Sequence, residues 1–102
     1  MSPYYDRQGK PLKLLEWGRK LEDREYRRLA ETTLPDGKRV STVWIGLDHQ
    51  FGERPPLIFE TMVFPSRNDM DEQDCERYTT EAEAKAGHDA MVEKWSLRSV
   101  LP

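Results

Sequence analysis

The segment LPDGK, residues 34–38, is the feature that most constrains how this chain can fold. Pro35 fixes the backbone φ angle at the first turn position, and Gly37 supplies the positive φ that closes a bulged hairpin. Residues with high β propensity stand on both sides of this turn. The sequence therefore predicts a hairpin with one strand over residues 26–34 and a second over residues 39–47.

The turn also predicts the register of this hairpin, because Leu34 then faces Lys38 across the two strands. Counting back from that pair gives Leu29 opposite Val43 and Arg27 opposite Ile45 on one face, and Ala30 opposite Thr42 and Arg28 opposite Trp44 on the other. The second strand is apolar on both faces, which predicts a central strand. The two helices are expected either on one face of the sheet or one on each, and the apolar residues on both faces of this strand favour the second arrangement. A third strand is expected over residues 57–64, the most apolar run of the chain, and a short fourth over residues 75–78.

Two amphipathic segments predict helices. Residues 11–22 place Leu14, Trp17 and Leu21 on one stripe, with Leu15 beside it, and we expect this stripe to lie on the sheet. Residues 80–95 begin with a capping box, Thr80 followed three residues later by Glu83. The apolar stripe of this second helix comprises Ala84, His88, Met91 and Trp95, and we expect Gly87 to allow close approach to the sheet.

The predicted fold class is thus α+β, a three- to four-stranded antiparallel β-meander with an N-terminal and a C-terminal helix packed on it. The 102 residues make one domain, with an N-terminal arm over residues 1–10, the meander over 26–64 and a tail over 96–102. Hydrophobic residues make up 36% and charged residues 34%, which indicates a folded protein with a thin core. No apolar run approaches the roughly 20 residues that span a bilayer, so no membrane association is expected. The N-terminus has no apolar signal segment and Cys75 is the lone cysteine, so a cytoplasmic location is expected.

The charge is unevenly distributed along the chain. Residues 1–39 carry ten Lys and Arg against seven Asp and Glu, whereas residues 40–102 carry six against twelve. In the basic half, Arg24, Arg27 and Arg28 alternate with acidic residues, a mixture typical of a solvated helix face. Nucleic-acid binding is therefore not the expected function.

The connection DHQFGERPP, residues 48–56, is longer than a hairpin requires, and loops of this kind carry binding function more often than strands do. Its one large apolar residue, Phe51, either is exposed or folds back over the edge of the sheet. Trp44, placed opposite Arg28, either forms a surface cation–π pair or is covered by another element. The residues predicted to bind a partner are Asp48, His49, Phe51, Arg54 and Trp44.

No catalytic motif, Gly-rich phosphate loop or metal-binding spacing occurs in the sequence, so no catalytic residue, metal or cofactor is expected. Glu60, inside the third strand, would be a candidate acid or base if it were buried without a partner, but we expect it to face solvent or pair with an arginine. We expect His88 to be a structural histidine. The acidic neighbours of Cys75 raise the pKa of a thiol and disfavour a nucleophilic thiolate.

The chain also resembles a family of small uncharacterised proteins of bacteriophages and prophage-bearing bacteria, especially actinobacterial ones. The resemblance runs through LLEWGRKLEDREYRRLAETTLPDGKRVSTVWIGLDHQFG, PPLIFETMVF and DCERYTTEAEAKAGHDAMVEKW. It implies a phage or mobile-element origin and the cytoplasm of the host cell, but no activity and no catalytic residues.

Three functions follow as hypotheses. The first is a small phage-type accessory protein that binds a host or phage protein. The second is a small-ligand-binding protein or enzyme that uses Asp48, His49, Glu60 and His88. The third is a nucleic-acid or nucleoprotein binder. Both a monomer and a homodimer are compatible with the sequence.

Overall fold

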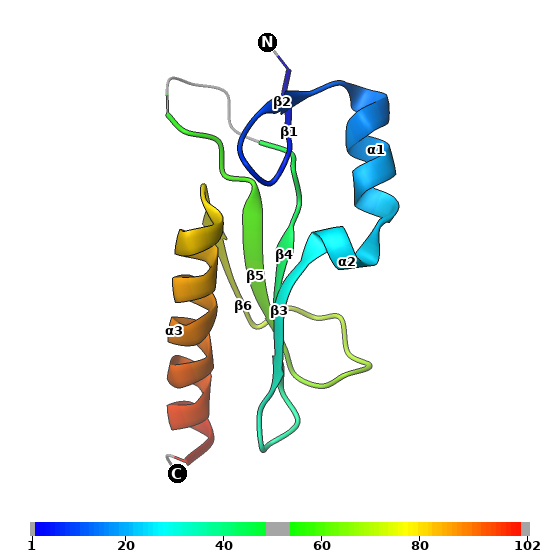
Figure 1. Ribbon diagram of the computed structural model, residues 1–102. Coiled ribbons are helices and arrows are strands. Elements are labelled where there is room, and N and C mark those ends of the chain that lie inside the picture. Colours follow the sequence, from blue (N-terminus) through cyan, green and yellow to red (C-terminus); the bar gives the residue numbers. More distant parts are fainter. Residues whose placement is uncertain (1, 49–53, 101–102) are drawn as a thin grey trace.

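The computed structural model describes residues 2–48 and 54–100 and has the predicted α+β class (Figure 1). A four-stranded antiparallel sheet in the order β3-β4-β5-β6 forms the body of the molecule, and β1 and β2 form a second, two-stranded sheet. The predicted fourth strand is confirmed. The elements are β1 (Tyr4–Tyr5), β2 (Pro11–Leu12), α1 (Leu14–Glu22), α2 (Arg24–Arg27), β3 (Arg28–Thr33), β4 (Arg39–Trp44), β5 (Phe59–Phe64), β6 (Asp74–Tyr78) and α3 (Glu81–Val100).

The LPDGK turn closes the β3–β4 hairpin as predicted. The amide of Leu34 donates to the carbonyl of Lys38 at 2.8 Å, and Gly37 has a φ of 93°. The pairing of Ala30 with Thr42 is confirmed.

The register beyond Ala30 was predicted wrongly. A bulge between Arg28 and Ala30 places Arg28 opposite Val43, so the predicted pairs of Leu29 with Val43, Arg27 with Ile45 and Arg28 with Trp44 do not form. The cause lies just before the strand, where the Asp23 carboxylate accepts from the amide of Tyr26 and starts the short helix α2. The first predicted strand therefore begins at Arg28 rather than at residue 26, and Leu29 is the extra residue of the bulge.

The central strands are also shorter than predicted. β4 ends at Trp44, because the amides of Ile45 and Gly46 both donate to the carbonyl of Ile58 and Gly46 turns the chain with a φ of 64°. β5 accordingly begins at Phe59 and not at residue 57. Past the turn, the chain pairs with the N-terminal arm, since Tyr4 bridges to Leu47.

Helix α3 runs along the four strands and covers one face of the sheet (Figure 1). Its capping box is confirmed, because the amide of Glu83 donates to Thr80 Oγ1 at 3.1 Å and the amide of Thr80 donates to Glu83 Oε1 at 3.1 Å. The predicted stripe of Ala84, His88, Met91 and Trp95 is buried. The helix continues to Val100 instead of ending near residue 95, because no Gly or Pro interrupts the sequence between Gly87 and Pro102.

Helix α1 does not lie on the sheet, contrary to the sequence-based prediction. Pro11 and Leu12 pair with β1 as strand β2, so the helix begins only at Leu14. It lies beside β1 and α2, away from α3 (Figure 1), and leaves Leu14 57% and Leu15 75% exposed. Its other side is anchored, because Trp17 and Leu21 pack against the core. Trp17 also stacks on Tyr4, and its Nε1 donates to the carbonyl of Ile45 at 3.0 Å.

The core consists of two apolar clusters separated by a polar layer. One cluster contains Leu12, Trp44, Ile58, Phe59 and Ala84, and the other contains Leu34, Val40, Val63, Met91 and Trp95. Along β4, Thr42 stands between Val40 and Trp44, and buried Thr61 and His88 stand at the same level on β5 and α3.

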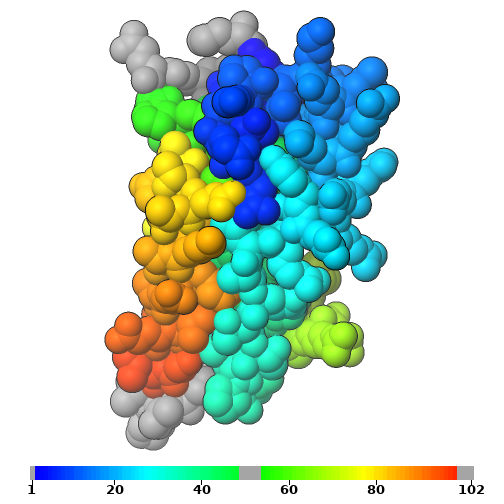
Figure 2. Space-filling view, in the orientation of Figure 1, coloured from blue at the N-terminus to red at the C-terminus, as the bar shows by residue number. Residues whose placement is uncertain are grey.

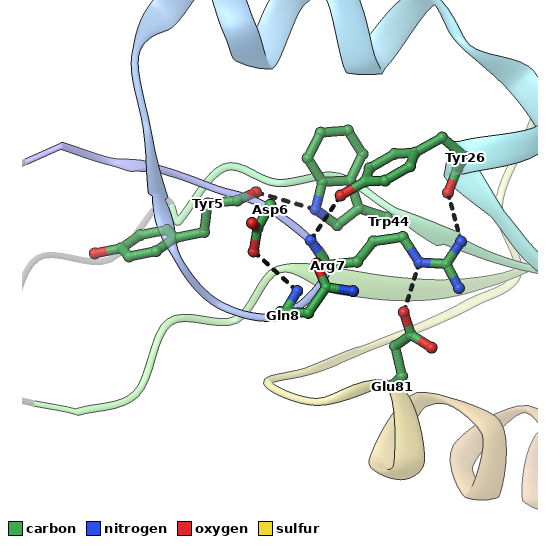
Figure 3. A network of polar contacts seen from close by, with 7 residues as sticks. All are labelled: Tyr5, Asp6, Arg7, Gln8, Tyr26, Trp44 and Glu81. Atoms are coloured by element: carbon green, nitrogen blue, oxygen red, sulfur yellow. Dashed lines mark hydrogen bonds and ion pairs between the residues drawn. The ribbon is translucent and has the colours of Figure 1, made fainter.

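A polar network around Arg7 joins the N-terminal arm to α2 and α3 (Figure 3). Arg7 Nε donates to Glu81 Oε1 at 2.6 Å, and Arg7 Nη1 donates to the carbonyl of Tyr26 at 3.1 Å. The Tyr26 hydroxyl accepts from the amide of Arg7, while the Tyr26 ring packs edge-on against Trp44 at a centroid distance of 5.0 Å. The network fixes α2 at the end of the sheet.

Among the described residues, the face of the sheet opposite α3 is not covered by a second long helix, and the four-residue α2 contacts β3 and β4 at the end of the sheet. The favoured arrangement with both faces covered is therefore wrong. The paired residues on this open face include Val43 with Glu60, Ser41 with Met62, Glu60 with Arg77 and Met62 with Cys75.

Within residues 2–48 and 54–100, no helix has the length and apolar character to cross a bilayer.

Candidate functional site

Five arginines border two adjoining hollows beside β3, which we call the arginine trough. The first hollow, of about 260 Å³, is lined by Arg24, Arg27, Arg28, Glu31, Arg39, Ser41 and Val43. The second, of about 570 Å³, shares Arg28, Glu31 and Arg39 with the first and adds Leu29, Ala30, Thr33 and Arg67. With Glu31 as its one acidic lining residue, the trough is strongly positive.

Four elements bring these arginines together. Arg24 and Arg27 come from α2, which the Asp23 cap and the Tyr26 contacts hold at the end of the sheet. The bulge in β3 places Arg28 opposite Val43, and Arg39 lies on the same face of β4, four residues before Val43. Arg67 comes from the loop between β5 and β6, which projects from the body of the molecule as the lime segment of Figure 2.

Arg39 is held in the trough by a hydrogen bond and a ring contact. Its Nη1 donates to Glu31 Oε1 at 3.1 Å, and its guanidinium carbon lies 4.6 Å from the centre of the Phe64 ring. Arg28 Nε lies 3.6 Å from the other oxygen of the Glu31 carboxylate. Glu31 thus aligns two arginines without neutralising the trough.

Two arginines of the trough have a buried Nε–H group that donates no hydrogen bond. Among the described residues, Arg27 Nε and Arg39 Nε are the buried side-chain nitrogen or oxygen atoms without a hydrogen-bond partner. A buried donor without an acceptor costs about 1–3 kcal/mol, more for a charged group, so such atoms are rare in proteins. Both side chains also line the first hollow, so the trough contains guanidinium groups whose hydrogen-bonding capacity is only partly used.

The predicted partner-binding residues do not form one surface in the described part of the structure. Trp44 is 0% exposed and belongs to the core, so its assignment to a binding surface is wrong. Its indole Nε1 donates to the carbonyl of Tyr5 at 3.1 Å, and Tyr26 covers its ring where Arg28 was expected. The burial arises from the N-terminal arm, which the strand pattern of β4 does not reveal.

The remaining four residues belong to the loop after Leu47. The amide of Asp48 donates to the carbonyl of Pro3 at 3.0 Å, which ties the start of the loop to the N-terminal arm. Arg54 is exposed. His49 and Phe51 lie outside the described residues, so their assignment to a binding surface stays a prediction.

Glu60 pairs with an arginine, as expected. It is 6% exposed, and its Oε2 accepts from Arg77 Nε at 2.8 Å and lies 3.6 Å from Cys75 Sγ. Burial, followed by the charges of Glu60 and Glu72, raises the pKa of Cys75 to about 11. The expectation of a weakly reactive thiol is confirmed in direction, although burial and Glu60 rather than Asp74 and Glu76 are the main causes.

His88 is a structural histidine, also as expected. It is 3% exposed, and both ring nitrogens have partners: Nδ1 lies 2.7 Å from Thr42 Oγ1 and Nε2 lies 2.8 Å from Thr32 Oγ1. Glu60 faces the open side of the sheet and His88 faces the opposite side, so these two members of the proposed catalytic set do not meet. In the described residues, no group of three or more His, Cys, Asp and Glu side chains is placed to hold a metal ion.

Arg24, Arg27 and Arg28 stand together in the sequence, whereas Arg39 and Arg67 were not predicted to join them. Side chains alternate between the two faces along β4, so Arg39 must share a face with Ser41 and Val43. This pattern could have placed Arg39 in the trough. No local pattern places Arg67, which reaches the trough only through the path of its loop.

No family model matches the chain, and comparisons with the curated proteins and with the solved structures found no significant match.

Proposed function

We propose that this protein acts by binding another protein, and that its binding surface is the open face of the sheet with the arginine trough. The observation that supports this most is the side of the sheet that α3 leaves uncovered. Four arginines line the hollow around Ser41 and Val43 there, and Arg67 joins two of them at the adjoining hollow. Interfaces are enriched in arginine, and a few residues in a central hollow provide most of the binding energy. The trough combines these features on one side of a small rigid sheet.

The origin of the partner follows from the resemblance to small phage and prophage proteins. An accessory protein of this kind would bind a host or phage protein in the cytoplasm of the host cell. The Asp48 to Arg54 segment with Phe51 belongs to the proposal as a second contact region.

The experiment is affinity capture of the tagged protein from lysate of the organism that encodes it, with two matched charge reversals. Arg28→Glu alters the trough at an exposed side chain, and Lys85→Glu makes the same charge change on the exposed side of α3. We expect Arg28→Glu to lower recovery of the partner about tenfold, the effect of 1.4 kcal/mol, and Lys85→Glu to retain it. Equal recovery with both variants would contradict the assignment of the surface.

A nucleic acid or nucleoprotein is the second candidate partner, because the structure groups Arg24, Arg27 and Arg28 with Arg39 instead of dispersing them. A nucleic-acid complex that releases counterions loses affinity steeply as salt increases. The test measures binding of labelled DNA and RNA over a range of salt concentrations, with and without Arg28→Glu. Binding that weakens steeply with salt and is lost in Arg28→Glu favours the nucleic acid, and its absence favours the protein partner.

A further inference from the structure

The arginine trough also indicates what kind of partner it recognises. The inference rests on the proposed function, since it identifies the chemistry of the partner for the same surface. Arg27 and Arg39 each border the first hollow and each hold a buried Nε donor without an acceptor among the described residues. The two side chains thus place positive charge and unused donor capacity beside one hollow.

Guanidinium groups bind planar anions through two parallel hydrogen bonds, which a carboxylate provides. Inside the trough Glu31 bridges two arginines, because its two carboxylate oxygens lie 3.1 Å from Arg39 Nη1 and 3.6 Å from Arg28 Nε. One carboxylate thus lies between two arginines, and the positive charge of the other arginines remains for further carboxylates.

The trough suits an acidic peptide better than a nucleic acid. Its lining contains no aromatic side chain, and the neighbouring Phe64 is buried beneath Arg39, so unpaired bases have no platform on which to stack. A long polyanion would also meet Glu31 within the trough and the acidic segment that follows Arg67, with Asp69, Asp71 and Glu72. A short segment avoids the acidic residues that follow Arg67.

We infer that the arginine trough binds a short protein segment with two or more closely spaced Asp or Glu side chains, and that Arg27 and Arg39 form the centre of the carboxylate-binding site. The first carboxylate reaches the donors of Arg27 and Arg39, and a second contacts Arg28 or Arg67. Leu29, Ala30 and Val43 give the trough apolar walls against which the methylene groups of the peptide pack.

The test is fluorescence anisotropy with a short labelled peptide in which Asp and Glu alternate with Ser and Gly. The control peptide carries Asn and Gln at the same positions. We expect the acidic peptide to bind and the amide peptide to bind at least about tenfold more weakly, since hydrogen bonds to charged groups contribute the equivalent free energy. The variants Arg27→Gln and Arg39→Gln should each weaken binding by a similar factor.

Because Arg39 also packs on Phe64, Arg28→Gln serves as a second variant at an exposed side chain, and circular dichroism verifies that each variant is folded. Lys85→Gln is the matched control, with the same loss of charge on α3, and should bind like the unmodified protein.

Three results would overturn the inference: equal binding of the acidic and amide peptides, unchanged binding by folded Arg27→Gln and Arg28→Gln, or preferential binding of labelled DNA or RNA over the acidic peptide. Self-association through the trough, seen as a dimer that Arg28→Gln dissociates and that excludes the peptide, would also overturn it. If the acidic peptide fails while Arg28→Glu still abolishes capture of a partner, the carboxylate chemistry is wrong and the proposed protein-binding surface stands.

Discussion

At the level of single residues, His88 lies in the polar layer between the two apolar clusters of the core. Thr42 Oγ1 lies 2.7 Å from its Nδ1 and 2.5 Å from Thr61 Oγ1, so the histidine joins a chain of hydroxyl groups between α3, β4 and β5. Burial lowers the pKa of His88 from its ordinary value of 6.5, with Asp89 acting in the opposite direction. The imidazole is therefore held neutral in the folded protein.

This burial predicts how stability changes with pH. Because the unfolded chain binds a proton at His88 more readily than the folded protein does, the stability contribution is complete above pH 6.5 and is lost as the pH falls through the lower, folded pKa. Urea unfolding measured at decreasing pH should show a free energy of unfolding that falls below pH 6.5. Asp74 acts in a separate, more acidic range, because the Lys94 hydrogen bond lowers its pKa below 3.8.

The control is His88→Gln, which has a donor and an acceptor but does not titrate. We expect this variant to be less stable at neutral pH and to lack the decline just below pH 6.5. His49 is present in both proteins, so its contribution cancels in the difference. Parallel pH profiles for the two proteins would show that His88 does not cause the decline.

At the scale of elements, the two helical glycines have opposite roles. A Cβ built on Gly87 would lie 2.2 Å from ring atoms of Tyr78, which confirms that this glycine allows α3 to approach β6 closely. A Cβ built on Gly18 of α1 meets nothing within 4 Å. The same residue type is thus a packing requirement in one helix and a weak point in the other.

We therefore expect opposite effects from the same substitution at these two positions. Gly87→Ala should lower the free energy of unfolding by about 1–3 kcal/mol, because the added methyl group displaces Tyr78. Gly18→Ala should raise it by up to about 1 kcal/mol, because alanine favours the helix and finds open space. Chemical denaturation of both variants measures the difference, and a stabilising Gly87→Ala would show that Tyr78 moves aside without cost.

At the scale of the whole molecule, the Arg7 network holds the N-terminal arm, α2 and α3 together (Figure 3). The contacts that position Arg24 and Arg27 at the trough therefore include residues 19 and 74 positions away in sequence from Arg7. The binding surface depends on the assembled chain and not on the hairpin alone.

Removal of the Arg7 side chain tests this dependence. We expect Arg7→Ala to lower the free energy of unfolding by about 1–3 kcal/mol, since it leaves the Tyr26 carbonyl and the Glu81 carboxylate without their charged donor. Hydrogen exchange should become faster in residues 4–12 and 24–27 before it changes in β4 and β5. Glu81→Gln removes only the partly exposed ion pair and should cost less than about 1 kcal/mol. An Arg7→Ala protein with unchanged exchange in α2 would mean that Asp23 and Tyr26 hold that helix without Arg7.

The sequence by itself determined the features with a local cause. The Pro and Gly of residues 34–38 determined the hairpin turn, Thr80 and Glu83 determined the start of α3, and the spacing of Ala84, His88, Met91 and Trp95 determined its buried face. These follow from backbone angles, capping hydrogen bonds and helical periodicity, which act within a few residues.

Only the tertiary structure decided the β3 bulge, the position of α1, the burial of Trp44 and the arginine trough. The β4 strand has apolar residues on both faces, so its pattern cannot say which face α3 covers. Trp44 is buried because Tyr26, Gly46 and the N-terminal arm close around it, and Arg67 reaches Arg39 through a loop. These contacts join residues far apart in sequence, and their energies depend on the packing of the complete chain rather than on any local pattern.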